Sequence, residues 1–136
     1  MTRINLVKPK ELYDQHLVAE YREIFMVGSS LVRSLKSPRW LTTIRNIPKE
    51  FTLNTGHVLF FYDKGLYLSK RYNSLIEEML ARKMQPDPTR IFKRFQWPDY
   101  LYNDWSPKPN DLDIIRKRLA EKVSIKPKWY RKTESI

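Results

Sequence analysis

A chain of 136 residues with 41% hydrophobic and 13% aromatic residues has the length and apolar content of one folded domain. Its 26 Lys and Arg against 15 Asp and Glu give a formal charge of +11, which favours a polyanionic partner, nucleic acid ahead of an acidic membrane. The lack of cysteine excludes disulfides, iron–sulfur clusters, thiolate nucleophiles and cysteine-based zinc sites.

Other classes of protein are disfavoured by patterning. No apolar run is long enough to cross a membrane, and the N-terminus MTRINLVKPK is too polar for a secretory signal, so we expect a cytoplasmic protein. His16 and His57 are too far apart in the sequence to suggest a metal site, and we expect no metal dependence. The predicted fold is all-α, a single compact domain over residues 1–136 with about three main helices.

The first predicted helix runs from about Pro9 to Leu35, because proline is favoured at a first helical position and Ser37-Pro38 ends the segment. At 100° per residue, its apolar side chains share one face, which we expect to be core: Leu17, Val18, Tyr21, Ile24, Phe25, Gly28, Leu31, Val32 and Leu35. The opposite face carries Gln15, His16, Ala19, Arg22, Glu23 and Met26. Such a polar face is usually only solvated, although the small Ala19 leaves room for a ligand.

The second predicted helix begins after Asn54 or Thr55 as cap, beyond a stretch at 38–55 that we expect to be loop. It runs to about residue 83, and Gly65 inside it predicts a kink or a close helix contact. Its predicted core positions are Leu68, Tyr72, Leu75, Met79 and Leu80.

The third predicted helix follows a proline-rich connection over residues 84–110, which cannot be one helix. We expect this connection to be pinned to the core by aromatic side chains, Phe92, Phe95, Trp97 and Trp105. The helix has Asn110 as cap and Asp113 at its third position. Its apolar stripe is Leu112, Ile115, Leu119 and Val123.

The C-terminal stretch KVSIKPKWYRK interleaves cations with Trp129 and Tyr130. The cations, which include Lys122 and Arg131, suit phosphates, and the rings suit bases or sugars. The alternative is a basic tail whose tryptophan docks into the core.

The α-amine of Thr2, once Met1 is removed, is a candidate nucleophile. A free α-amine has a pKa near 7.7–8.0 against about 10.4 for lysine, so a useful fraction is uncharged at neutral pH. The adjacent Arg3 lowers the pKa of the amine further. Such an amine can attack C1′ of a damaged nucleotide, expel the base and hold the sugar as an imine that promotes strand cleavage. Every protein has an N-terminus, however, so the amine alone carries little weight.

Five sequence blocks, in order along the whole chain, resemble one known family. They are MTRINL at 1–6, DQHLVAEYRE at 14–23, GHVLFFYDK at 56–64, RLAEK at 118–122 and PKWY at 127–130. The chain resembles the phage and algal-virus pyrimidine-dimer DNA glycosylases of the endonuclease V type, which repair ultraviolet damage. Residues 27–53 and 84–117 match weakly.

The resemblance implies roles for residues in these blocks. The Thr2 amine forms the imine, and Glu23 stabilises the developing sugar cation and moves protons in the elimination. The positions that grip the distorted strand are Arg3, Gln15, His16 and Arg22, and those that hold the backbone and minor groove are Arg118, Lys122, Trp129 and Tyr130. It also implies an all-helical monomer without a cofactor, which binds lesion-containing duplex DNA, flips a base, and threads its N-terminus between helices to the DNA-facing cleft.

One departure from the family pattern bears on the substrate. The family usually has an arginine three residues after the catalytic acid, where this chain has Met26, and Arg33 or Lys36 are the cations that could replace it. We therefore retain three hypotheses. The first is a glycosylase and abasic-site lyase on pyrimidine dimers. The second keeps the chemistry but acts on abasic or oxidised-base sites, and the third is a non-catalytic DNA-binding module.

Overall fold

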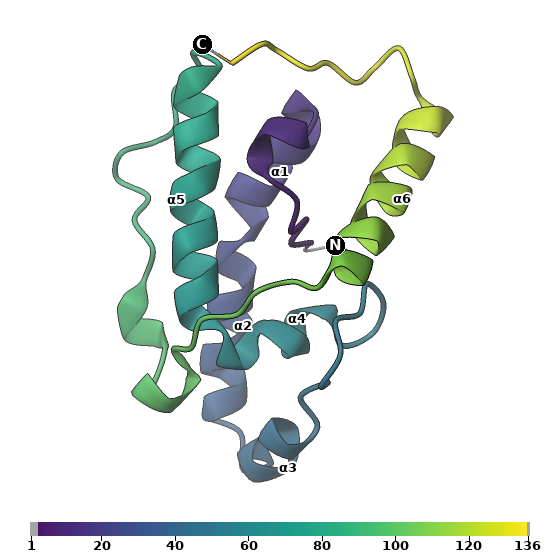
Figure 1. Cartoon of the computed structure of the whole chain (residues 1–136). Helices are drawn as coiled ribbons and strands as arrows, with labels where there is room; N and C mark the ends of the chain where they lie inside the picture. Colours follow the sequence, from purple (N-terminus) through teal and green to yellow (C-terminus); the bar gives the residue numbers. More distant parts are fainter. Residues whose placement is uncertain (1–2, 136) are drawn as a thin grey trace.

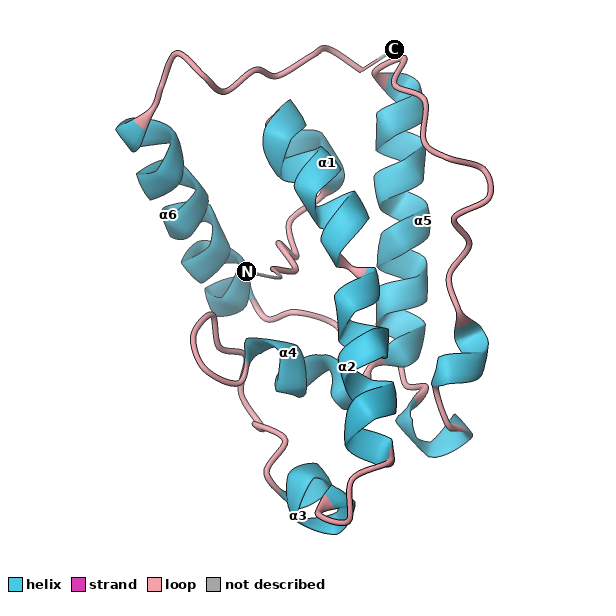
Figure 2. Cartoon of the chain, turned by 180° about the vertical axis from the view of Figure 1, so that it is seen from behind, coloured by secondary structure: helices cyan, strands magenta, loops and turns pink. Residues whose placement is uncertain are grey.

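The computed structural model describes residues 3–135, and every regular element in that range is a helix, so the predicted all-α fold is confirmed. The α-helices are α1 (Asp14–Glu23), α2 (Phe25–Leu35), α3 (Trp40–Arg45), α4 (His57–Phe60), α5 (Gly65–Ala81) and α6 (Pro109–Ile125), and the 3-10 helices are η1 (Pro9–Glu11), η2 (Phe61–Asp63), η3 (Arg94–Gln96) and η4 (Asp99–Leu101). None of these helices has the length and apolar character needed to span a membrane. Figure 1 shows α1 and α2 following one another between α5 and α6, and Figure 2 shows the same arrangement from behind.

Residues 9–35 form η1, α1 and α2 instead of the one predicted helix. The carbonyls of Pro9 and Lys10 accept hydrogen bonds from Nη2 of Arg82, at 3.1 and 3.3 Å, whereas a continuous helix would offer them to its own amides. The break between α1 and α2 is slight, because Ile24 keeps helical torsions (φ −56°, ψ −31°). The predicted core face is confirmed, with each of its residues buried or half-buried.

Residues 56–83 are also divided, into α4, η2 and α5. The cap of α4 is Gly56 with φ 96°, not the predicted Asn54 or Thr55, because the chain enters this helix through the left-handed region that glycine tolerates. The prediction that Leu80 is core is wrong, since its side chain is 58% exposed. It follows the buried Met79 by 100° around α5, and only one face of that helix is covered.

Gly65 is the first residue of α5 and lies in a close contact, which is made with the proline-rich connection and not with another helix. A Cβ there would lie 2.8 Å from ring atoms of Trp97 and of Tyr102, closer than side-chain atoms pack. The connection that follows α5 therefore reaches back to the start of the same helix. The glycine is required by packing and not by its torsion angles.

Part of the stretch predicted to be loop is helical, as α3 shows. The ring of Trp40 lies 6.4 Å from that of Tyr62, and its Nε1 donates a hydrogen bond to the Tyr100 hydroxyl at 3.1 Å. These tertiary contacts hold a short helix that sequence periodicity does not reveal.

The third predicted helix is present as α6, but it begins two residues earlier than predicted. Pro109 is its first residue, and the Asp111 carboxylate accepts a hydrogen bond from the Lys108 amide at 2.9 Å. Asn110 is therefore inside the helix and not its cap, because a first-turn proline needs no amide partner. The predicted stripe on α6 is confirmed, with Ile115 fully buried.

The proline-rich connection is pinned by three of the four predicted aromatics. Trp97 is buried, and Phe92 and Trp105 pack against the core. Phe95 is 83% exposed, so its predicted core contact is wrong. It lies on η3, where the neighbouring Gln96 is the residue that faces α2.

The segment before α1 lies inside the molecule. Ile4, Leu6 and Val7 are buried, and Figure 1 shows this purple segment running through the middle of the fold between α1 and α6. The Val7 amide donates a hydrogen bond to the Asn5 carbonyl at 2.5 Å, which closes a tight turn with Leu6 at φ 55°. This threading of residues 3–8 agrees with the expected course of the N-terminus.

Candidate active site

A buried ion pair anchors the N-terminal segment. Glu20 of α1 and Arg71 of α5 meet at 2.6 Å (Nε to Oε2) and 3.0 Å (Nη2 to Oε1), with side chains 0% and 5% exposed. Each partner also binds the segment: Glu20 Oε1 accepts from the Asn5 amide at 3.2 Å, and Arg71 Nη1 donates to the Val7 carbonyl at 2.5 Å. Burial alone would lower the pKa of Arg71, but the Glu20 carboxylate outweighs burial and raises it. The two side chains form a buried ion pair, and their charges are satisfied largely by one another and by this backbone.

His57 of α4 provides a second anchor. Its Nε2 lies 2.9 Å from the Ile4 amide, which donates to it, and its Nδ1 lies 2.7 Å from the Thr52 carbonyl. Since a carbonyl only accepts, Nδ1 carries the proton and the ring is neutral. Burial lowers the pKa of His57, in agreement with this assignment. His57 is therefore a structural acceptor and not a metal ligand here.

A cleft of about 430 Å³ opens where the anchored segment meets α1 and α6. Its walls come from three parts of the chain: the N-terminal segment, the exposed side of α1 and one side of α6. The lining residues are Arg3, Asn5, His16, Ala19, Glu20, Glu23, Arg118, Leu119 and Lys122. Of the two acids, Glu20 is occupied by Arg71, whereas the Glu23 side chain makes no hydrogen bond or ion pair with any of residues 3–135. Glu23 is thus the carboxylate available to a ligand.

Positive charge is concentrated around Glu23. Burial lowers the pKa of Arg3, and the charge of Arg118 lowers it further against the opposing effect of Glu23. Burial, followed by Arg3 and Arg118, likewise lowers the pKa of Lys122. Cations that depress one another's pKa are destabilised by their proximity, and a bound phosphate would relieve that repulsion. The cleft therefore has the charge to attract an anion, and of its two carboxylates Glu23 is the one without a partner among residues 3–135.

His16 forms the end of the cleft nearest the C-terminal segment. Burial, then Lys122 and Arg3, lower the pKa of His16, which favours the neutral ring. Tyr130 stacks on it with ring centroids 4.7 Å apart and planes at 27°. Both ring nitrogens are buried and have no hydrogen-bond partner in the described part of the chain. The tyrosine from the tail therefore covers a residue of the cleft.

A model of the family described as pyrimidine dimer DNA glycosylase matches residues 1–92, more than half of the chain. The chain belongs to this family. The matched range holds the anchored segment and the α1 wall of the cleft, while α6 with Arg118 and Lys122 comes after it. Within residues 3–135, no three His, Asp or Glu side chains gather where they could hold a metal ion.

The cleft of this pyrimidine dimer DNA glycosylase family member brings together five of the residues predicted from sequence. These are Arg3, His16, Glu23, Arg118 and Lys122. Arg22 is exposed on α1 outside the lining of the cleft, and Met26 is 53% exposed on α2. Thr2, the predicted nucleophile, lies outside the described residues. Its neighbour Arg3 is in the cleft with Glu23.

The remaining predicted residues lie on or beside the C-terminal tail. Gln15 uses its side-chain amide to bind the tail backbone, donating to the Trp129 carbonyl at 2.5 Å and accepting from the Arg131 amide at 3.0 Å. Trp129 and Arg131 are exposed and Tyr130 is half-buried. The alternative in which Trp129 docks into the core is therefore wrong.

Three residues that build the site were not predicted from the sequence: Glu20, Arg71 and His57. They are buried, and a search for exposed functional groups does not find them. A signal for the first two was present, since each charge stands among core positions of its helix, Glu20 beside Tyr21 and Arg71 beside Tyr72. A charge at a core position predicts a buried partner. No comparable signal in the sequence marks His57 as the acceptor for the Ile4 amide.

Proposed function

We propose that this protein is a DNA glycosylase and abasic-site lyase that works through its N-terminal amine. The Thr2 nitrogen bonds to C1′ of the damaged nucleotide as the bond from C1′ to the base breaks, and the base leaves with a proton. Opening of the sugar ring gives an imine. Loss of a C2′ proton then expels the 3′-phosphate and cuts the strand. We further propose that the protein acts as a monomer inside the cell.

The observation that carries this proposal is the Glu23 carboxylate, which has no partner among residues 3–135, in a cleft shared with Arg3, the residue directly after Thr2. A carboxylate at such a place can stabilise a positively charged sugar and can accept and return protons. Arg3, Arg118 and Lys122 in the same cleft can hold the flanking phosphates. The arrangement combines an acid–base group with cations that can hold phosphates, in a cleft lined by the residue that follows the proposed nucleophile in the sequence.

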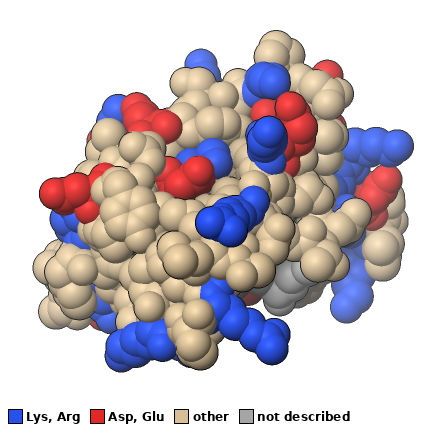
Figure 3. Space-filling model, turned by 90° about the horizontal axis from the view of Figure 1, so that it is seen from below, with Lys and Arg blue, Asp and Glu red and all other residues tan. Residues whose placement is uncertain are grey.

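The proposed partner is duplex DNA, and the charge of +11 supports it. Figure 3, which views the molecule from below, shows Lys and Arg side chains spread around that face, with the acidic side chains mostly in its upper half. Basic residues are therefore not confined to the cleft. They provide sequence-independent attraction to phosphates beyond it.

Borohydride reduction tests the imine directly. We expect reduction during reaction with abasic-site DNA to leave a stable adduct, and peptide mapping to find it on Thr2. Glu23→Gln is expected to lower turnover about 100-fold or more while leaving DNA binding largely intact, as expected for loss of an acid–base group. Glu77→Gln, at an exposed position on α5, is the matched control. Absence of any trapped species, or an adduct at a lysine, would contradict the proposal.

Protein that retains Met1 offers a second control. One additional residue displaces the amine by about 3.8 Å, beyond bonding reach, so this form should bind DNA but give no adduct. Intact mass establishes which form is present. If both forms bind abasic DNA but neither form is trapped, the non-catalytic binding module replaces the enzyme.

A second candidate substrate is favoured by Met26. Its exposed side chain stands where family members have an arginine, and Arg33 lies on the same face of α2, about 10 Å further along the axis. A contact to the dimer or its phosphates is therefore missing at this point. Cleavage of duplexes that carry a dimer, an abasic site or an oxidised base separates the substrates, and a strong preference for the dimer excludes the second candidate.

A further inference from the structure

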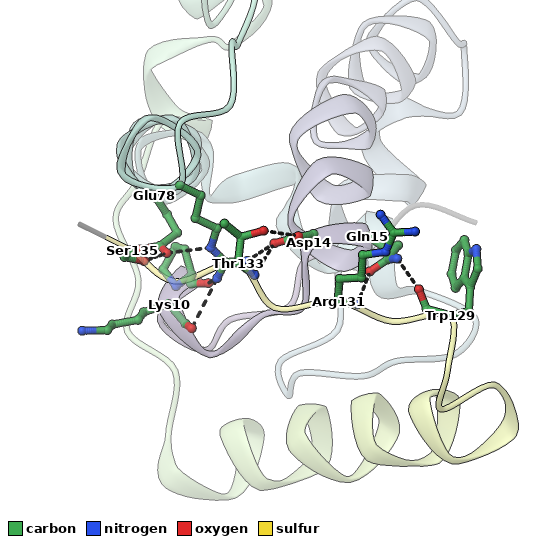
Figure 4. A network of polar contacts seen from close by, with 10 residues as sticks. Lys10, Asp14, Gln15, Glu78, Trp129, Arg131, Thr133 and Ser135 are labelled. Carbon is green, nitrogen blue, oxygen red and sulfur yellow. Dashed lines mark hydrogen bonds and ion pairs between the residues drawn. The ribbon is translucent and has the colours of Figure 1, made fainter.

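Residues 129–135, called here the C-terminal strap, cross the molecule from the end of α6 to the end of α5. Figure 1 shows this yellow segment running along one edge of the fold, and Figure 4 shows it passing over the start of α1. The strap is attached to α1 through Asp14 and Gln15 and to α5 through Ser135, whose hydroxyl bonds to Glu78. It therefore ties the far end of α6 to two other helices.

The attachment to α1 is a continuous set of hydrogen bonds. Gln15 binds the backbone on both sides of Tyr130: its Nε2 donates to the carbonyl of Trp129, and its Oε1 accepts from the amide of Arg131. Asp14 binds the next residues of the strap: its backbone amide donates to the Arg131 carbonyl at 2.6 Å. Its carboxylate accepts from the Thr133 amide at 3.1 Å and from the Thr133 hydroxyl at 2.6 Å.

The two acids that bind the strap, Asp14 and Glu78, are themselves held in place. Arg82, whose side chain is almost fully buried, donates to Asp14 Oδ1 at 2.9 Å and to Glu78 Oε2 at 2.8 Å. The two acids that hold the strap are therefore held by one arginine. Breaking a single strap contact should leave Asp14, Glu78 and Arg82 in place.

The strap determines where two aromatic rings lie. Tyr130 stacks on His16, and its ring also meets that of Tyr13 edge-on at 5.7 Å. Trp129 packs edge-on against Tyr130 at 4.9 Å while more than half of its surface stays exposed. An exposed indole supported from behind, at the edge of a basic cleft, suits contact with a base or sugar.

We propose that Asp14 and Gln15 are positioning residues, which fix the strap so that Trp129 and Tyr130 are in place before DNA arrives. The ligand in this inference is the DNA of the proposed function. Both polar atoms of the Gln15 amide already bind the strap, so its effect on DNA passes through Trp129 and Tyr130. A strap without these bonds must be ordered during binding, and that cost weakens affinity.

A double-mutant cycle on the full-length chain tests the inference. The measured quantity is the Kd for a duplex with a tetrahydrofuran abasic analogue, which cannot form an imine. Gln15→Leu alone is expected to weaken binding about fivefold to thirtyfold, the effect of losing one to two hydrogen bonds. In the Trp129→Ala/Tyr130→Ala background the same change should have less than about a twofold effect. Gln85→Leu, at an exposed position, is the matched control.

The cycle distinguishes positioning from direct contact. If Gln15→Leu weakens binding equally in both backgrounds, Gln15 contacts DNA itself and the inference is wrong. An unchanged Kd in the otherwise wild-type chain also overturns it. Should Gln15→Leu fail to fold, Thr133→Val removes one strap bond near the same site, with Thr42→Val on α3 as control, and the same coupling to the two rings is expected.

Amide hydrogen exchange gives an independent readout. The Arg131 and Thr133 amides should be protected in the wild-type chain and exchange faster in Gln15→Leu. Equal exchange in both proteins would show that these bonds do not hold the strap. Because the binding assay needs no imine, failure of borohydride trapping refutes only the chemistry of the proposed function, and loss of coupling refutes only the strap.

Discussion

Replacing Arg71 with Met would leave the Glu20 carboxylate buried without its partner. Glu20 is fully enclosed and accepts two hydrogen bonds from Arg71, so little water can reach it after the change. Removing one member of a buried ion pair costs about 3–5 kcal/mol. That is a large share of the roughly 5–15 kcal/mol that stabilises a domain of ordinary size. The Val7 carbonyl also loses its donor, which loosens the segment that carries Arg3 into the cleft.

Urea unfolding at pH 7, followed by circular dichroism, measures this loss. Lys70→Met is the matched control on the same helix, because Lys70 pairs with Asp104 at the surface and its loss should cost less than about 1 kcal/mol. Glu20→Met and the double variant complete a cycle, and the two sites should be coupled by about 1–3 kcal/mol. An Arg71→Met protein within 1 kcal/mol of wild type, or effects that simply add, would refute the argument that this pair anchors the N-terminal segment.

Three further predictions concern pH, the tail and packing. The pKa of His57 is lower in the folded chain than its unfolded value of about 6.5, so the unfolded state binds more protons as the pH falls. The free energy of unfolding should therefore decrease from about pH 7 to 5.5, and it should decrease less steeply in His57→Gln. Urea unfolding repeated across that pH range measures both slopes. Tyr130→Ala uncovers His16 and should raise its pKa towards the ordinary value in an NMR titration, while the pKa of His57 stays unchanged as the internal reference. Gly65→Ala should cost about 1–3 kcal/mol, because its Cβ meets the rigid Trp97 ring. The Cβ of Gly28→Ala would collide only with the movable end of the Gln96 side chain, with the Trp97 indole at an ordinary contact distance, so this change should be near neutral. Thermal melts of both variants measure the difference, and equal effects would contradict this interpretation of the two glycines.

Sequence reasoning located most of the helical content and the polar face of α1. The 3.6-residue spacing of apolar side chains around Leu17, Leu68 and Ile115 predicts three buried helix faces, and these are present. Helix ends were predicted less well. The division near Pro9 depends on hydrogen bonds from Arg82, more than seventy positions away, and the one at Gly65 depends on Trp97. Local periodicity contains no information about such partners.

The amino-acid sequence by itself determined the chemistry that this protein can use. It excluded thiolates, supplied an excess of cations, and placed Glu23, His16 and Arg3 in blocks that resemble one family. The tertiary structure decided which of these groups meet. It took Gln15 out of the cleft to bind the tail and enclosed Glu20 with Arg71, leaving Glu23 as the cleft carboxylate without a partner among residues 3–135. The reason is that a side chain's role depends on which distant atoms satisfy its hydrogen bonds and charge, and only the packed fold fixes those partners.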